Sequence, residues 1–382
     1  MKILAIVDRI ENGKDGVGDF TQQMIDFYEE KIQWIVVTKK NENNAGITIP
    51  TRNERDCFWV DNWGLNSYST LKKIIREKKP DWLFIQYVPF SFNKKGIPFF
   101  WIGILLLLRI KKVKTSIFFH EVAVDPYQQS FKLFLLGISQ RWIGKLMALL
   151  ANCNFTSNRI YQQLLLPASS TVIPIPSNFE KVYRSLSQMP IEQVVSDEKI
   201  NIVSFTNRCS IALLDAFYYL YSIGFTSLQL HLVGKADKYH KEVLQKHIAQ
   251  KSLTDKVTIL PDTDAAILLA EMSRATIYIQ IENVNTKGQG GASSKSGIMA
   301  TALMLGLPII TTKGNLTDET YFKNKETVFF AEQHSDSIAS AIIEVLNDKM
   351  LRENMSANSR NTYNSFFSWS ILTEKINSTF LV

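Results

Sequence analysis

A regular alternation of short apolar segments with segments of helix length constrains the fold most. The apolar segments are KILAIVD, IQWIVVTK, WLFIQYV, TSIFFHE and TVIPIP in the first half of the chain, and KINIVSF, LQLHLVG, VTIL, TIYIQI and LPIITT in the second. Strands that are apolar throughout, rather than at every second residue, are typical of parallel sheets covered by helices on both faces. The pattern therefore predicts an α/β fold and argues against a sandwich of hairpins.

The length of the chain indicates two such domains, because 382 residues exceed the usual size of one hydrophobic core. We expect a Rossmann-like domain at residues 1–178 and a second one at residues 199–365. Residues 179–198, which are rich in Ser, Gln, Pro and charges, are expected to be the linker. Residues 366–382 are expected to form a separate final helix.

The composition, with 46% hydrophobic and 21% charged residues, excludes a disordered or collagen-like chain. The formal charge of +7 allows attraction to phosphate-bearing ligands, anionic lipid or nucleic acid. The basic residues are scattered and form no stripe interleaved with aromatic residues, so we expect no nucleic-acid partner.

The three cysteines are Cys57, Cys153 and Cys209, which lie far apart and form no CxxC pair. Neither a zinc site nor a disulfide framework is indicated, and a reducing compartment fits best. The first residues form a predicted strand and lack the order of a secretion signal. We expect a cytoplasmic protein.

Two apolar segments leave a peripheral position on the membrane open. Residues 97–110, IPFFWIGILLLLRI, are too few to cross a bilayer, which takes about 20 residues. Residues Phe131–Leu150 mix Lys132, Arg141 and Lys145 with Leu, Phe and Trp, as a helix on a membrane surface does. Core packing is one interpretation of both segments. The other is attachment to the anionic inner face of the membrane.

The first candidate site follows the first strand, which ends at Asp8. Gly16 and Gly18 stand on either side of Val17, just before a helix that begins near Asp19. Glycines there let the backbone approach a ligand, and a helix N-terminus offers N–H groups to phosphate. The spacing is not GxGxxG, so an ordinary tight turn is the alternative.

His120 and Glu121 end the predicted strand TSIFFHE, at the same edge as the glycine turn. A histidine at a strand end is a better functional candidate than His231, which lies inside the strand LQLHLVG and is expected in the core. Structural hydrogen bonding is the alternative for His120.

The richest segment is KGQGGASSKSGIMATALMLGLPIITTKG, which leads from the strand TIYIQI into a predicted helix at residues 296–305. Its glycines free the backbone, and the hydroxyl groups of Ser293, Ser294 and Ser296 can donate hydrogen bonds. Lys295 adds a cation at the positive end of the helix. The segment lacks GxxxxGK[ST], so it predicts an anion site that is not a P-loop.

Two other strands of the second half are followed by basic residues. Arg208 follows the strand KINIVSF. Gly234 is the last residue of LQLHLVG, and Lys235 comes directly after it. The carboxyl ends of parallel strands share one edge, so these cations can reach the same anion. A surface ion pair is the alternative for Arg208.

These residues resemble the retaining glycosyltransferases of the GT-B fold, specifically family 4-like enzymes (glycosyl transferases group 1), many of which act in bacterial cell-envelope and exopolysaccharide synthesis. The resemblance covers nearly the whole chain. It rests on GVGD at residues 16–19, QYVPFSF at 86–92, FFHE at 118–121, TSN at 156–158 and GASSKSGIMATALMLGLPIITT at 291–312. The last pattern is the most specific.

The resemblance implies two Rossmann-like domains whose parallel sheets face an interdomain cleft, with the final helix crossing back to the first domain. It implies transfer of a hexose from a UDP- or GDP-linked donor to a glycan or lipid-linked acceptor, without a metal or other cofactor. His120, Gly18 and Asp19 would act at the reaction centre, with His120 beside the transferred sugar. The donor would be bound by Gly16, Arg208, Gly234, Lys235, Gly291, Ser293, Ser294, Lys295, Ser296, Gly297 and Thr301.

The family pattern includes two glutamates, eight residues apart, that contact the donor sugar and its ribose. This sequence lacks both of them. Ser293 and Thr301 stand at those positions, and spacing does not show that Glu282 or Glu319 replaces them. The departure leaves the donor open. It also supports an alternative, a catalytically silent nucleotide-sugar-binding or partner subunit on the same fold.

Overall fold

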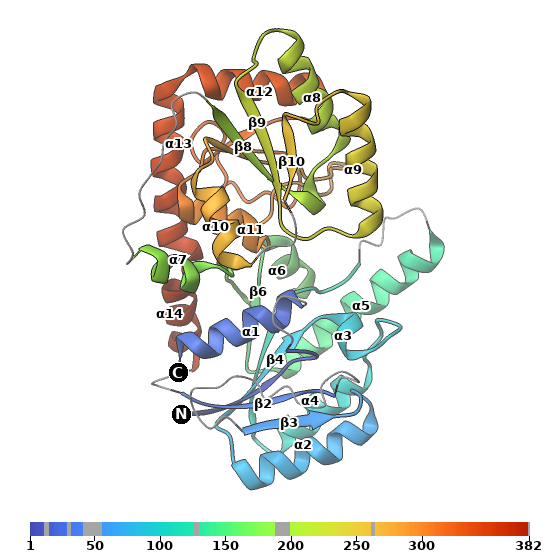
Figure 1. Ribbon diagram of the computed structural model, residues 1–382. Coiled ribbons are helices and arrows are strands. Elements are labelled where there is room, and N and C mark those ends of the chain that lie inside the picture. The colour runs from blue at the N-terminus through green and yellow to red at the C-terminus, as the bar shows by residue number, and fades with distance from the viewer. Residues whose placement is uncertain are drawn as a thin grey trace. The chain divides into compact units, whose positions relative to one another are not determined.

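The computed structural model describes residues 1–10, 15–28, 32–40, 56–124, 130–187, 199–260 and 264–380. The chain divides into two compact units (Figure 1). We call Met1–Pro174 with Leu372–Val382 the N-terminal domain, and Ile175–Ile371 the C-terminal domain. Each is described by itself.

The N-terminal domain is built on a seven-stranded sheet of order β3-β2-β1-β4-β5-β6-β7, in which every pair is parallel. The strands are β1 Lys2–Ile6, β2 Gln33–Lys39, β3 Asp56–Val60, β4 Trp82–Tyr87, β5 Lys114–Phe119, β6 Cys153–Thr156 and β7 Thr171–Val172. The helices between them are α1 Gly16–Phe27, α2 Leu65–Lys78, α3 Pro89–Phe92, α4 Phe100–Ile110, α5 Phe131–Leu150 and α6 Arg159–Leu165.

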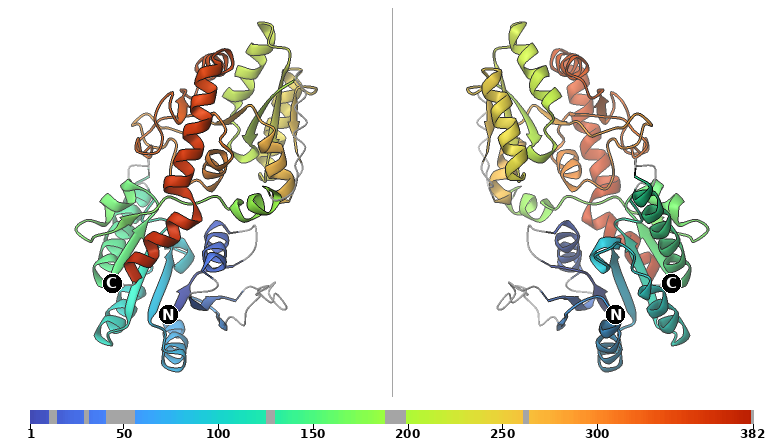
Figure 2. Two further views of the ribbon diagram at one scale, coloured as in Figure 1. Left: turned by 90° about the vertical axis from the view of Figure 1, so that its left-hand side faces the viewer. Right: turned by 90° about the vertical axis from the view of Figure 1, so that its right-hand side faces the viewer.

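Both faces of this sheet are buried, which is why its strands are apolar throughout. Alternate strand residues such as Leu4 and Ile85 pack with α2, α4, α5 and α6. On the other face, Phe20 of α1 contacts Phe118 at a ring distance of 5.1 Å. Figure 2 shows helices on both sides of the sheet.

The C-terminal domain has a six-stranded parallel sheet of order β10-β9-β8-β11-β12-β13. Its strands are β8 Ile200–Phe205, β9 Leu228–Val233, β10 Val257–Ile259, β11 Ile277–Gln280, β12 Ile309–Thr311 and β13 Val328–Phe330. Its helices are α7 Glu180–Ser187, α8 Ile211–Ser222, α9 Lys238–Gln250, α10 Ala265–Ser273, α11 Gly297–Leu305, α12 Ser335–Asn347 and α13 Lys349–Thr362, followed by a π-helical turn at Tyr363–Phe367.

The same two-sided packing is found here. Leu230 and Ile279 on one face pack with α8, α9 and α12. Val203 and Tyr278 on the other face pack with α10 and α11. The predicted α/β fold with parallel sheets is therefore confirmed, and each of the ten predicted strands contributes to a sheet.

The sequence analysis missed three short strands, β3, β6 and β13. β3 and β13 are edge strands, and β6 lies next to the edge strand β7. Runs of three to five residues, such as VFF at Val328–Phe330, are too short to stand out by periodicity alone.

The domain boundary lies earlier than predicted, between Pro174 and Ile175 rather than at residue 178. Part of the expected linker is α7, whose apolar residues Val182, Tyr183 and Leu186 pack on the core of the C-terminal domain. Their spacing of one, three and four residues places them on one helix face. Residues 188–198 of the expected linker lie outside the described residues.

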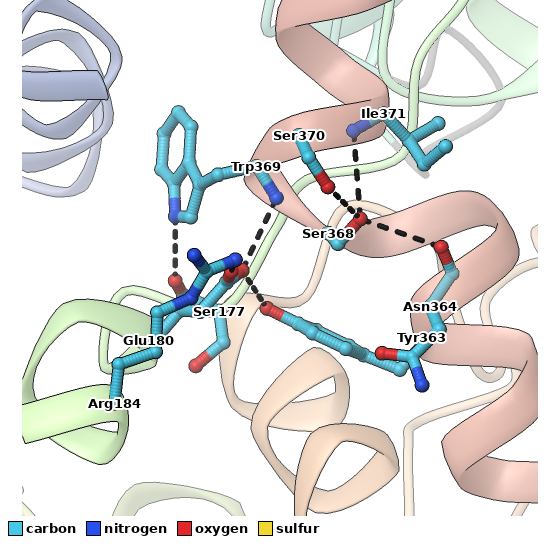
Figure 3. A network of polar contacts seen from close by, with 9 residues as sticks. All are labelled: Ser177, Glu180, Arg184, Tyr363, Asn364, Ser368, Trp369, Ser370 and Ile371. Atoms are coloured by element: carbon cyan, nitrogen blue, oxygen red, sulfur yellow. Dashed lines mark hydrogen bonds and ion pairs between the residues drawn. The ribbon is translucent and has the colours of Figure 1, made fainter. Parts of the chain in front are cut away.

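A buried carboxylate fixes α7 to the end of the C-terminal domain (Figure 3). Glu180 is 3% exposed and accepts hydrogen bonds from Tyr363 Oη at 2.5 Å and Trp369 N at 3.1 Å, and it pairs with Arg184. Trp369 Nε1 donates to Ser177 O at 2.9 Å. Burial and the Glu180 carboxylate raise the pKa of Tyr363, so its phenol stays a donor.

The last helix, α14 Trp369–Phe380, begins in the C-terminal domain, and its residues from Leu372 onward belong to the N-terminal domain. Tyr28 Oη donates to Thr373 O at 2.6 Å. The Phe380 ring, 3% exposed, lies 4.9 Å from Trp82, 5.5 Å from Phe84 and 6.3 Å from Phe155. These contacts cover the face of the N-terminal sheet that α1 leaves open.

We expect Phe380→Ala to destabilise the N-terminal domain by about 3 to 5 kcal/mol, the usual cost of removing a buried phenylalanine. Ile110→Ala is the control, since Ile110 is 69% exposed and its loss should cost less than about 0.5 kcal/mol. Urea unfolding followed by tryptophan fluorescence measures both. Equal midpoints for Phe380→Ala and the parent chain would contradict the described packing of α14.

Candidate functional site

The candidate site of the C-terminal domain lies at the carboxyl edge of its sheet. The strand order reverses between β8 and β11, which are paired neighbours. In open α/β sheets, ligands bind beside such a reversal, outside the carboxyl ends of the strands. The segments that leave β8, β9 and β11 therefore lie where a ligand is expected.

Arg208 and Glu282 meet at this reversal. Arg208 ends the short 3-10 turn after β8, and its Nη1 lies 3.4 Å from Glu282 Oε2, two residues beyond β11. Behind them, Gln280 donates to Glu282 and accepts from Tyr278 Oη at 2.5 Å. Burial and the Glu282 carboxylate raise the pKa of Tyr278. A hydrogen-bonded chain thus runs from the buried strand to the half-exposed guanidinium and orients it.

Gly234 fixes the turn after β9. Its φ is +80°, and a Cβ there would lie 2.1 Å from Cε2 of Phe205. Only glycine fits this position without displacement of the ring. The turn places Lys235 at the surface of the same edge, one strand away from Arg208.

The glycine-rich segment after β11 is held against the loop that follows β12. Gly290 and Gly291 have φ values of +119° and +87°. A Cβ on Gly291 would lie 2.3 Å from Gly314 N, and one on Gly290 would lie 1.8 Å from Asn283 O. These two glycines therefore permit close packing between two segments of the protein's own backbone. The sequence pattern alone could not distinguish this role from close approach of the backbone to a ligand.

The start of α11 carries the polar groups that the sequence indicates. Ser296 is the N-cap and accepts from Met299 N at 3.2 Å, while Ser293 Oγ accepts from Lys295 N at 3.2 Å. Accepting these bonds leaves each hydroxyl its own proton to donate. Gly297 leaves room at the first helical position, since a Cβ there would come no closer than 3.5 Å to Pro176 O.

Two other predicted donor-binding residues face the protein interior. Ser294 and Thr301 are fully buried. Thr301 Oγ1 lies 2.8 Å from Ser177 Oγ and donates to Gly297 O at 2.9 Å, which ties α11 to the segment before α7. The backbone of Ser294 accepts from Ile175 N at 2.8 Å. These contacts give the Thr301 side chain a structural role and hold Ser294 through its backbone.

In the N-terminal domain, Gly16, Gly18 and Asp19 lie in the first turn of α1, which begins at Gly16 and not near Asp19 as predicted. Asp15 is the N-cap and accepts from Val17 N at 3.2 Å. A Cβ on Gly18 would lie 2.5 Å from Arg9 O, whereas one on Gly16 would have nothing within 4 Å. Gly18 thus allows the helix to approach the loop after β1, and two carboxylates flank the start of the helix.

His120 lies beside the same turn. Its ring is 5% exposed, packs 4.9 Å from the ring of Phe20 and stacks on Phe118 at 4.5 Å. His120 Nε2 is 2.7 Å from Gln86 Oε1, and this hydrogen bond orients the ring. His231 is half-buried rather than in the core, with Nδ1 3.2 Å from Glu271 Oε2.

Among the described residues, no group of three or more His, Cys, Asp or Glu side chains is placed to hold a metal ion. The cysteines are free thiols. Burial raises the pKa of Cys57 to about 11 and those of Cys153 and Cys209 to about 12, so the thiolates are disfavoured at neutral pH.

The family described as Glycosyl transferases group 1 matches residues 211–362, which run from α8 to the end of α13. The solved structure of sucrose-phosphate synthase from Thermosynechococcus elongatus is similar over 99% of this chain and 98% of that one, with a TM-score of 0.71 and 15% identity. The chain has the GT-B fold, and its residues 211–362 are similar to the glycosyl transferases group 1 family.

Two further solved structures share this GT-B fold. Anabaena Alr3699/HepE in complex with UDP and glucose gives a TM-score of 0.67 at 14% identity, over 99% of both chains. UDP-GlcNAc 2-epimerase from Neisseria meningitidis bound to UDP-GlcNAc gives a TM-score of 0.63 at 13% identity, over 100% of both chains. A comparison with curated protein sequences gives no match.

The part of the candidate site that the sequence analysis missed is the contact of Glu282 with Arg208 and the hydrogen-bonded chain behind it. The signal was Gln280, a polar residue in the otherwise apolar strand TIYIQI, followed by a carboxylate two residues later. A buried amide in a strand needs a hydrogen-bond partner, which here is Glu282. Sequence spacing could not show that Arg208 would complete the pair.

Gly18→Ala and Gly16→Ala form a matched pair for the turn before α1. We expect Gly18→Ala to destabilise the protein by about 1 to 3 kcal/mol, because its Cβ would overlap the Arg9 carbonyl oxygen. Gly16→Ala should cost no more than about 0.5 kcal/mol, because its Cβ meets open space in a helical turn. Thermal melts of both variants measure this difference, and equal losses would show that the turn is not packed as described.

Proposed function

We propose that this GT-B protein is a glycosyltransferase that moves a hexose from a UDP- or GDP-linked donor to a hydroxyl group of a glycan or lipid-linked acceptor. We further propose that it retains the anomeric configuration and acts on the cytoplasmic side in the synthesis of a cell-envelope or extracellular polysaccharide. The family match supports glycosyl transfer. HepE in complex with UDP-glucose supports a nucleotide-sugar donor.

The proposed donor site is based on one observation. Lys235 and Arg208 follow the neighbouring strands β9 and β8, and Lys295 stands just before α11, the helix that follows the next strand, β11. Strands lie about 4.8 Å apart, so the three strand ends span roughly 10 Å, a distance that one nucleoside diphosphate can bridge. The start of α11 adds N–H groups and the Ser293 and Ser296 hydroxyls.

This edge suits the departure of a diphosphate. Transfer breaks the bond between the anomeric carbon and a diphosphate oxygen, and the electron pair of that bond stays on the diphosphate. Cations and N–H groups that are already in place stabilise this charge without reorganising. Arg208 has five donors, so it can hold Glu282 and a phosphate oxygen together.

The start of α1 suits the acceptor better than the diphosphate. Asp15 already caps this helix, and Asp19 stands in its first turn. Two carboxylates repel a phosphate, but they accept hydrogen bonds from sugar hydroxyls. We therefore assign Gly16, Gly18 and Asp19 to the acceptor side, and His120, which contacts Phe20, to the sugar being transferred.

Lys295→Ala should weaken binding of the free nucleoside diphosphate by roughly 10- to 150-fold, because a hydrogen bond from a charged group contributes about 1.5 to 3 kcal/mol. Lys349→Ala is the control, since its side chain is 78% exposed at the start of α13 and its loss removes the same charge. Titration calorimetry with UDP and GDP measures both variants. Unchanged affinity in Lys295→Ala would remove the proposed donor site.

His120→Ala should lower turnover on the order of 100-fold while leaving nucleoside diphosphate affinity nearly unchanged, because misplacing a group beside the reacting sugar costs rate rather than donor affinity. Gln86→Leu should act in the same direction, since it removes the bond that orients the ring. Steady-state rates and calorimetry on both variants separate the two effects. Full turnover in His120→Ala would remove its assignment.

The second candidate is a catalytically silent nucleotide-sugar-binding or partner subunit. It is favoured by Ser293 and Thr301, which stand where the resemblance places two glutamates, and by the buried hydroxyl of Thr301. Incubation with a panel of nucleotide sugars, with and without glycan acceptors, decides between the two. Released nucleoside diphosphate supports transfer, whereas saturable donor binding with no release in any mixture supports the silent subunit.

A further inference from the structure

The exposed apolar side chains of the N-terminal domain are concentrated on two adjacent helices. Half of the large hydrophobic side chains that are exposed in the described residues lie in residues 99–150. Leu106 and Ile110 on α4 are 48% and 69% exposed, and Phe131, Trp142 and Leu146 on α5 are 75%, 63% and 41% exposed. Such a concentration of exposed apolar side chains is typical of a binding surface, whereas scattered single residues are ordinary.

These side chains form the outer faces of helices whose inner faces are also apolar. On α5, Ile143 and Met147 are buried in the core of the domain, while Trp142, Leu146 and Leu149 recur on the outside at helical spacing. The two helices end side by side, since Arg109 Nη1 of α4 donates to Leu149 O of α5 at 2.8 Å. Figure 1 shows the first turns of α5 extending away from the sheet.

The charged residues of these two helices have one sign. α4, the Lys111–Lys112 pair after it and α5 contain no aspartate or glutamate. They carry Arg109, Lys111, Lys112, Lys132, Arg141 and Lys145. We call the exposed apolar residues of α4 and α5, together with these six basic residues, the α4–α5 face.

α5 is the one described helix long and apolar enough to cross a membrane. Packing argues against a crossing, because a third of its most apolar window is buried inside the domain. Withdrawing Ile143 and Met147 from the core to span a bilayer would expose the face of the sheet that they cover. A helix with one face in the core and the other apolar and rimmed by lysines fits a position parallel to a membrane surface.

We propose that the α4–α5 face docks on the surface of an anionic lipid bilayer. Trp142, Leu146 and Ile110 enter the boundary between headgroups and acyl chains, and the basic residues contact the anionic headgroups. A second protein copy would bury the apolar residues equally well, but it would bring exposed Lys111, Lys112 and Lys132 near their like-charged counterparts, since α4 and α5 themselves contain no acidic residue. Charge complementarity therefore selects the bilayer. This inference does not depend on the proposed glycosyl transfer.

The test is flotation of the full chain with vesicles of phosphatidylcholine alone and of phosphatidylcholine mixed with phosphatidylglycerol, at low and high salt. The protein should float with the mixed vesicles and be released in part by salt, because screening weakens the contacts with headgroups. The double variant Trp142→Glu with Leu146→Glu should lower the bound fraction about 10-fold or more, since it places two charges at the apolar boundary.

Two further double variants sharpen the test. Tyr239→Glu with Met350→Glu adds the same charge at exposed apolar residues of the C-terminal domain, 76% and 65% exposed, and should float as the parent chain does. Lys111→Glu with Lys132→Glu should remove the dependence on phosphatidylglycerol. Circular dichroism and thermal melts confirm that each variant is folded, so a failure here is separate from a failure of the donor site.

Three results would overturn the proposal. The parent chain could stay at the bottom of the gradient with both vesicle types. Both glutamate pairs could reduce flotation equally, which would reflect net charge rather than this face. Sedimentation could show a dimer that only Trp142→Glu with Leu146→Glu dissociates, with no vesicle binding, which would assign the face to a second copy of the chain.

Discussion

The rest of the structure depends on strands whose hydrogen bonds are satisfied within a parallel sheet and whose two faces are both covered by apolar side chains. This arrangement leaves one place for polar chemistry, the carboxyl edge. Arg208, Lys235 and the loop before α11 reach that edge in the C-terminal domain. His120 and the start of α1 reach it in the N-terminal domain. Because strand direction determines where this edge lies, the position of both candidate sites follows from the parallel order of the strands.

The sequence predicted most of this fold because the signal was redundant. Ten apolar segments that alternate with segments of helix length left little choice of class. The helix after Ser296 and its end at Gly306 are where the pattern placed them. The boundary near residue 175 was harder to predict. Val182, Tyr183 and Leu186 of α7 are few and lie among polar residues, so only their packing on the C-terminal core shows that they belong to it.

The candidate site was predictable in position and less so in detail. A glycine in sequence can serve a ligand, a left-handed turn or contact with another loop, and Gly291 serves the last two because Gly314 N would lie 2.3 Å from its Cβ. The hydroxyl group of a serine or threonine can likewise bond to a ligand or to the protein itself. Thr301 bonds to Ser177 across 124 residues of sequence, a contact that no local pattern contains. The role of Glu282 became clear only from the structure, which places Arg208, 74 residues away in sequence, beside it.

Two apolar helices show why exposure has to be measured rather than deduced from composition. Seven of the nine residues of α11, from Met299 to Leu305, are buried, so its apolar composition is explained by the core of its own domain. α5 is also rich in Leu and Ile, but the domain covers only one of its faces. Apolar area left in water is unfavourable in rough proportion to its size. The outer face of α5 is therefore suited to binding something outside the chain. Because α5 carries basic residues and no acidic ones, an anionic lipid surface fits both its charge and its apolar residues.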